Sequence, residues 1–249
     1  MMRRRAPSEA GLTLIEVLLA VSLLSLLSVG MLAAIRMGFD ALHRTDAHLM
    51  ENRRVAVTQR LLDQEIAGLM PVQTLCAPDT ETPPTPFSFF QGQPQTMRLV
   101  SIYSLQEAWR GRPRILEFQV IAGDQGRGVR LIVNEIPYTT PLSAGLSCTG
   151  MAADPVTGMQ VPQFRPIQVG PQSFVLADKL AYCRFAYLEQ AQPPPVEPRW
   201  LTNWSQKGWP AGVRVEMAPL EDNRARLRPM TITTALPINR NPDKDYVDR

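Results

Sequence analysis

Residues 12–35 read LTLIEVLLAVSLLSLLSVGMLAAI and contain one charged side chain, that of Glu16. At ~1.5 Å per residue, a helix of this stretch is about 36 Å long, which is enough to span the hydrocarbon core of a bilayer. Arg3, Arg4 and Arg5 precede it, and such basic residues favour a cytoplasmic N-terminus. The sequence therefore predicts one transmembrane helix, with everything after it on the far side of the membrane.

A cleaved secretory signal peptide is the alternative interpretation of a basic start followed by an apolar run. The run of residues 12–35 is longer than the ~7–15 residues usual in a signal peptide, and no small-x-small cleavage site with a polar start follows it. Glu16 is a further difference from a signal peptide, because an unpaired carboxylate costs up to ~2.5–3.5 kcal/mol at the bilayer centre and less near an end. Glu16 therefore either needs a partner or lies near the interface and extends toward water.

Residues 36–70 are more polar but keep apolar side chains at helical spacing, which predicts an amphipathic continuation of the helix. Only Pro7 of the 23 prolines precedes residue 71. Pro71 cannot continue a helix and Gly68 weakens its last turn, so we expect one helix from residue 12 to about residue 69. The apolar positions of the continuation are Leu42, Leu49, Val55, Ala56, Leu62, Ile66 and Leu69.

Residues 11–17 read GLTLIEV, follow a short basic leader and begin the apolar run. This pattern resembles the class III signal of type IV prepilins and type II secretion pseudopilins, although Leu12 stands where the family commonly has phenylalanine. The resemblance implies that a prepilin peptidase cuts between Gly11 and Leu12 and methylates the new N-terminus at Leu12. Glu16 would then be the fifth mature residue. Its carboxylate could pair with the amine of its own chain or of a neighbouring subunit, and the family favours the neighbour as a register for assembly.

The resemblance also implies the organisation of the chain. A leader at residues 1–11 precedes a transmembrane helix at 12–35, an amphipathic continuation at 36–70 and a periplasmic β-rich head at 71–249. The implied fold class is α+β, with the long helix packed against an antiparallel β-sheet head in the manner of pilins. The protein would be a single-pass protein of the inner membrane, with its N-terminus cytoplasmic and its C-terminal head periplasmic.

A looser resemblance links residues 183–189 (CRFAYLE) and 209–217 (WPAGVRVEM) to J-type minor pseudopilins. It implies assembly at the tip of a type II secretion pseudopilus in support of protein export. The implied partners are the I-type and K-type minor pseudopilins, the major pseudopilin and prepilin peptidase. A minor type IV pilin that primes pilus assembly is the alternative within the class. A periplasmic binding or enzyme domain held by an uncleaved signal anchor is the alternative from a different class.

The second half of the chain has the alternation and turn signals of six or seven short strands. Residues 123–128 form a glycine-rich turn that predicts a hairpin between the second and third strands. The proline-rich residues 72–95 and 137–171 are expected to be irregular loops. Leu116, Phe118 and Val120 are predicted to face the core. The predicted strands are 97–103, 115–121, 129–136, one or two within 174–188 with Ala181, Cys183, Phe185 and Tyr187 on one face, 212–217 and 230–236.

Residues that could carry chemistry are sparse. The formal net charge is only +3, which gives no electrostatic case for nucleic-acid binding. Residues 145–150 (GLSCTG) are similar to a nucleophile elbow, but the second glycine is one place late and no histidine follows His48. His43 and His48 lie about 140° apart around one helix, so they cannot share a metal ion there. We expect no enzymatic activity and no cofactor.

Three cysteines allow at most one intramolecular disulfide. Cys76 and Cys148 lie in the two proline-rich segments and are the candidate pair in an oxidising periplasm, while a bridge involving Cys183 stays open. Asp243, Asp245 and Asp248 are candidate calcium ligands, and the alternative is an ordinary polar tail, so no metal site is assigned. Three tryptophans either fill the core or form a patch for a partner, and these are Trp200, Trp204 and Trp209.

Overall fold

A computed structural model describes most of the chain and gives an α+β protein, with an N-terminal apolar helix and a mostly antiparallel β-sheet region. The chain divides into two compact units, Met1–Met50 and Glu51–Arg249. The residues that the structure describes are 13–77, 83–104, 109–155, 157–190, 197–220 and 229–238. The sequence-based fold class is therefore correct at this level.

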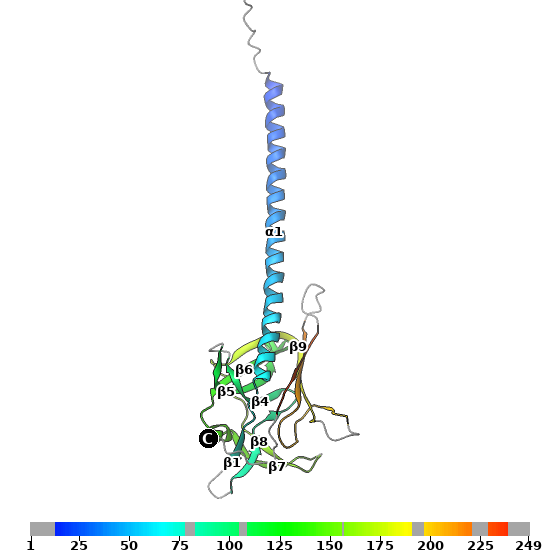
Figure 1. The fold of residues 1–249 in the computed structure, drawn as a ribbon. Coiled ribbons are helices and arrows are strands. Elements are labelled where there is room, and N and C mark those ends of the chain that lie inside the picture. The colour runs from blue at the N-terminus through cyan, green and yellow to red at the C-terminus, as the bar shows by residue number, and fades with distance from the viewer. Residues whose placement is uncertain are drawn as a thin grey trace, which may run out of the picture. The chain divides into compact units, whose positions relative to one another are not determined.

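The elements follow one another as a long helix and then a series of strands (Figure 1). The helices are α1 (Leu14–Ala67), α2 (Pro141–Gly145) and the 3₁₀ turn η1 (Asp124–Gly126). The strands are β1 (Gln73–Cys76), β2 (Thr85–Ser88), β3 (Gln91–Gly92), β4 (Thr96–Ser104), β5 (Trp109–Ala122), β6 (Val129–Pro137), β7 (Cys148–Ala153), β8 (Gln160–Phe164), β9 (Phe174–Leu188), β10 (Trp200–Leu201), β11 (Gly212–Pro219) and β12 (Met230–Ala235).

Helix α1 ends at Ala67, two residues before the predicted end, because the next residues bond to the sheet. The backbone N–H of Ile102 donates to the carbonyl of Gly68 at 2.9 Å, and that of Met70 donates to the carbonyl of Val100 at 2.8 Å. β4 thus supplies the hydrogen-bond partners of the Gly68 carbonyl and the Met70 N–H, which a continuing helix would bond within itself. The tertiary contact, together with Pro71, sets the helix end.

The main sheet has the strand order β12-β11-β9-β6-β5-β4-β3, and β10 pairs with β9 as well. Neighbouring strands are antiparallel. The long strand β9 joins the two halves, because its first part pairs with β6 and its later part with β11. The turn at residues 123–128 closes the predicted β5–β6 hairpin, with Gly126 and Gly128 at positive φ angles of 70° and 66°.

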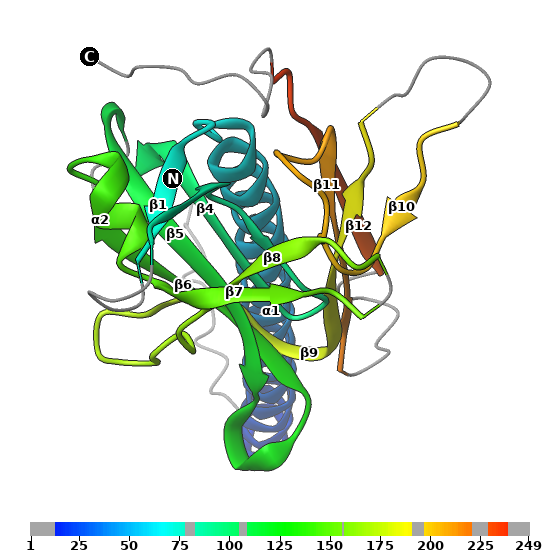
Figure 2. The same ribbon diagram turned by 90° about the horizontal axis from the view of Figure 1, so that it is seen from below.

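The sheet curves around the last turns of α1, which lie inside it (Figure 2). At one end Thr234 of β12 donates its hydroxyl to Asp63, and at the other end Leu69 forms a bridge with Ser101 of β4. Burying one helix face against a sheet is the usual way such a layer becomes stable. The core between them contains Leu62, Ile66, Leu99, Leu116, Phe118, Leu131, Val133, Phe185, Tyr187, Trp209, Val213 and Val215, together with smaller neighbours.

The opposite face of the sheet is also covered, by elements that the sequence analysis did not predict. Residues 72–95 and 137–171 were expected to be irregular, and this was wrong. Short strands β1 and β2 pair in the first segment, and α2, β7 and β8 form in the second. They bury a second cluster made of Val72, Cys76, Phe87, Phe89, Val100, Ile115, Ala144 and Cys148. These strands are only four to six residues long, and β2 and β8 contain Pro86 and Pro162, so they carry no long alternation that local patterns could reveal.

The other predicted strands are present, and β5 and β9 are longer than expected. The prediction that Ala181 shares the buried face of Cys183, Phe185 and Tyr187 was wrong, because Ala181 is exposed. The register between β9 and β11 shifts there, with Pro219 opposite Leu180 and Ala218 opposite Tyr182. A bulge of this kind adds one residue and displaces the alternation of side chains.

Candidate functional site: an exposed apolar helix segment with one carboxylate

The residues Leu14–Phe39 of α1 form a helix segment long and apolar enough to cross a membrane, and none of it is buried within the protein. Leu14 and Leu26 are 82% and 76% exposed. Such a run of exposed leucines is not stable against water and requires lipid or other helices around it. The segment is therefore a single candidate membrane anchor near the N-terminus.

Most polar side chains of this segment are satisfied by the helix itself. The hydroxyls of Ser22, Ser25 and Ser28 donate to backbone carbonyls three or four residues earlier, at 2.7–2.9 Å. This back-bonding lets a hydroxyl enter an apolar environment without a partner from outside. Glu16, near the start of the segment, and Arg36, near its end, are its charged side chains.

Glu16 lies in the first turn of α1 and its side chain is exposed. Its backbone N–H donates to the carbonyl of Thr13 at 3.0 Å. A carboxylate at this position is favoured by the positive end of the helix dipole, and it is available to a cation or amine from outside. Gly11 and Leu12, the predicted cleavage and methylation positions, lie outside the described residues.

The cysteines adopt the pairing that was the candidate from the sequence. Cys76 of β1 and Cys148 of β7 form a disulfide with a Cα–Cα distance of 5.5 Å, and it joins two small sheets on the outer face. Cys183 is a buried free thiol, and burial raises its pKa to about 12. A thiol protonated to that degree is a packing group and a poor nucleophile.

The other sequence candidates carry no reactive arrangement in the part of the chain that is described. Ser147 donates its hydroxyl to the carbonyl of Ala144 at 2.8 Å, near the end of α2. Among the described residues no group of three or more His, Cys, Asp and Glu side chains could hold a metal ion. Asp243, Asp245 and Asp248 fall outside those residues.

The three tryptophans divide between core and surface. Trp209 is 2% exposed and belongs to the core, as the core-filling interpretation predicted. Trp204 is half-buried, with its ring edge-on to Phe90 and its indole N–H donated to the carbonyl of Gly208. Trp200 is also half-buried, and the guanidinium of Arg214 lies 3.9 Å from its ring centroid. Each ring is therefore used within the chain.

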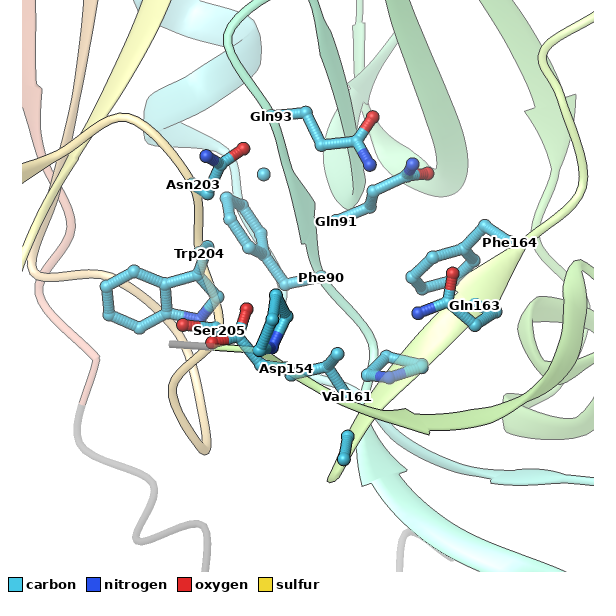
Figure 3. A pocket seen from close by; sticks show the side chains of 14 residues that line it. Phe90, Gln91, Gln93, Asp154, Val161, Gln163, Phe164, Asn203, Trp204 and Ser205 are labelled. Atoms are coloured by element: carbon cyan, nitrogen blue, oxygen red, sulfur yellow. The ribbon is translucent and has the colours of Figure 1, made fainter. Parts of the chain in front are cut away.

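A shallow cavity of about 230 Å³ lies between β3, the β7–β8 hairpin and the loop at residues 203–205 (Figure 3). Figure 3 shows amide side chains and aromatic rings around it, including Gln91, Gln163, Phe164 and Trp204. Its carboxylate, that of Asp154, accepts hydrogen bonds from the backbone and hydroxyl of Thr157. The cavity therefore presents no group arranged for acid–base or nucleophilic catalysis.

A buried polar network next to this cavity was missed, because the alternation that turns Leu116 and Phe118 toward the core leaves Glu117 on the other face of β5, which is also covered. Arg98 is 1% exposed and Glu117 is 7% exposed, and they form an ion pair. Arg98 also donates to the side-chain oxygen of Gln91 and to the carbonyl of Arg165, both at 2.6 Å, and lies over the ring of Phe164. The pair holds the outer elements on the sheet. Opposite charges on neighbouring predicted strands were the available signal.

Comparison with models of known protein families gives no match for this chain, and comparison with curated proteins finds no significantly similar sequence. What the described residues present is an exposed apolar helix segment bearing one carboxylate, on a helix whose last turns are enclosed by an antiparallel sheet. These features are consistent with single-pass anchoring in a membrane.

Proposed function

We propose that this chain is a prepilin-like subunit that is anchored in the inner membrane by its N-terminal helix and functions by assembly. The observation that carries the proposal is the apolar segment Leu14–Phe39, none of which is buried within the protein, with Glu16 in its first turn. Parallel packing of such helices removes their leucines from lipid or water. One carboxylate near the start of each helix supplies a polar contact at a fixed height.

Within this class we propose a J-type minor pseudopilin at the tip of a type II secretion pseudopilus, where it supports protein export. The sequence resemblances at residues 183–189 and 209–217 support this choice over a minor type IV pilin. Its partners would be the I-type and K-type minor pseudopilins and the major pseudopilin.

The disulfide between Cys76 and Cys148 supports a periplasmic location for the residues that follow the helix. Disulfides form and persist in the periplasm and are rare in the cytoplasm. Arg3, Arg4 and Arg5 support the cytoplasmic placement of the N-terminus by their positive charge.

Assembly would use the pairing of two opposite charges. Removal of residues 1–11 by prepilin peptidase leaves an amine on Leu12, about one helical turn from Glu16. When helices pack in parallel, Glu16 of one subunit neutralises the amine of its neighbour. A charge removed from water in this way is strongly unfavourable when its partner is missing. A helix that packs at the wrong height leaves both charges unpaired, so its assembly is disfavoured.

The experiment is N-terminal processing of the full chain in bacterial membranes, with and without an active prepilin peptidase. We expect the measured mass to correspond to a chain that begins at a methylated Leu12, and to do so only when the peptidase is present. Gly11→Val is the matched control and should keep the leader in both strains. A chain that begins at Met1 or Met2 despite active peptidase would support a signal anchor, and a cut after residue 35 would support a secretory signal peptide.

A further inference from the structure

Glu65 is a carboxylate buried beneath the end of α1, on the face that the main sheet encloses. Its exposed fraction is 0%, and it lies between the core residues Leu62 and Ile66. Neither oxygen of its carboxylate has a hydrogen-bond partner in the described part of the chain. An ionised carboxylate in this setting has lost its water without gaining a donor, which is strongly unfavourable.

On the sheet face toward Glu65 lie a hydroxyl, a second carboxylate and the side chain of Arg114, and none of these described groups hydrogen-bonds the Glu65 carboxylate. From β4, Ser101 donates its hydroxyl to the backbone carbonyl of Glu65 and not to its side chain. From β6, the carboxylate of Glu135 opposes ionisation of Glu65 by its own charge. Arg114 of β5 lies opposite Ser101 in the register and so on the same sheet face, while Arg112 is exposed.

Burial, followed by repulsion from Glu135, raises the pKa of Glu65 from 4.5 to about 8. The neutral acid is therefore the form that fits this position near neutral pH. The same turn of α1 is fixed to the sheet by backbone bonds at Gly68 and Met70 and by the Thr234–Asp63 bond. Glu65 is thus the buried carboxylate of this contact.

We propose that docking of the last turns of α1 on the sheet depends on a proton held by Glu65. With the proton the side chain stays buried and the helix end is docked, and without it the carboxylate draws the turn toward water. The docked helix end is then weakest in an alkaline environment. This inference does not rest on the proposed function, because it concerns residues 57–69 and their sheet alone.

The sign of the effect follows from proton linkage. Folded Glu65 keeps its proton up to about pH 8, whereas the undocked side chain loses it near the ordinary value of 4.5. Stability is therefore greatest below about pH 4.5, declines as the pH rises toward 8 and is constant above it. Within this window one proton is released on undocking, so the opening equilibrium constant rises about tenfold per pH unit.

The test is hydrogen exchange of the full-length protein in a nonionic detergent, followed by mass spectrometry of peptides from residues 57–69. Protection factors, corrected for the intrinsic pH dependence of exchange, are compared at pH 5.5, 6.5 and 7.5. We expect wild-type protection to fall about tenfold per unit and Glu65→Gln to change by less than about twofold over the whole range. Glu216→Gln, a half-buried carboxylate on β11, is the matched control and should keep the wild-type response.

Glu135→Gln removes the second cause of the raised pKa of Glu65. The fall in protection of this variant should therefore end at a lower pH than the fall in wild type. Glu65→Met replaces the acid by an apolar side chain of similar length and is used if the glutamine variant does not fold. A Glu65 variant that keeps the wild-type pH response would overturn the proposal. So would a wild-type protein whose protection in this segment does not change between pH 5.5 and 7.5.

Discussion

Arg98 and Glu117 stand directly opposite each other on β4 and β5, and Nε of Arg98 donates to Oε1 of Glu117 at 2.7 Å. They lie on the sheet face that is turned away from α1, where both are covered by the outer elements. Asn134 of β6 donates to the second oxygen of Glu117 and accepts a bond from the hydroxyl of Ser173. One ion pair therefore connects three central strands with the segments that cover them.

Arg98→Met should lower the free energy of unfolding by about 3–5 kcal/mol, because it leaves Glu117 buried without its cation. The double variant Arg98→Met with Glu117→Leu should recover most of this loss, since it removes the uncompensated charge as well. Urea denaturation of the full chain in detergent measures both. Arg130→Ala, which breaks an exposed ion pair with Asp124 and Asp178, is the control and should have a small effect.

If Arg98→Met proved as harmless as Arg130→Ala, the role assigned to the buried pair would be wrong. A double variant no more stable than Arg98→Met would show that the loss comes from packing of the arginine stem and not from the charge of Glu117.

Replacing Cys76 and Cys148 together by serine should destabilise the protein by about 4 kcal/mol. The cysteines are separated by 72 residues, and a cross-link over such a length removes much of the entropy of the unfolded chain. Treatment of wild type with a reductant should cause a similar shift in the urea midpoint. The serine variant should not respond to the reductant, and a response there would point to another bridge.

Cys183 should be unreactive toward maleimide in the folded protein at pH 7–9. Burial raises the pKa of its thiol to about 12, so almost no thiolate forms and the sulfur is out of reach. The thiol should become reactive in step with unfolding by urea. Fast labelling under native conditions, measured by mass spectrometry, would mean that β9 is not packed as described.

Glu16→Val should leave membrane insertion unchanged and reduce recovery of I-type and K-type partners on co-purification by about tenfold or more. Loss of an ion pair with an incoming amine is expected to cost at least ~1.4 kcal/mol, which corresponds to a tenfold change in binding. Ser22→Val, whose hydroxyl is satisfied within its own helix, is the control and should assemble normally. Normal recovery of the partners by Glu16→Val would remove the role given to this carboxylate.

Local patterns were sufficient for the elements whose residues interact along the chain. The apolar run that starts α1, the alternation of Leu116, Phe118 and Val120 and the glycine-rich turn at residues 123–128 each depend on near neighbours. The disulfide pair could be chosen because two cysteines occupied the proline-rich segments. Glu16 could be identified from the sequence because it is the one charged side chain in the apolar run of residues 12–35.

The features that were missed are short strands, a register shift and an ion pair between two strands. Strands β1, β2, β7 and β8 exist only in pairs, and their residues carry no long alternation of their own. Ala181 is exposed because the register with β11 shifts beside it. Glu117 is buried because Arg98 of a neighbouring strand meets it, and a single strand cannot show that its polar side chain has such a partner.

The sequence alone determined that this chain has one apolar helix with a carboxylate near its start, followed by a β-rich region. Composition and periodicity decide these points, since they reflect the solvent that each segment can tolerate. The tertiary structure decided where α1 ends, which cysteines pair and which polar side chains are enclosed. It also decided that the carboxylate of Glu65 lies among leucine and isoleucine with no hydrogen bond from the part of the chain that is described. Burial of a polar group depends on what packs over it, and that is set only when the sheet closes around the helix.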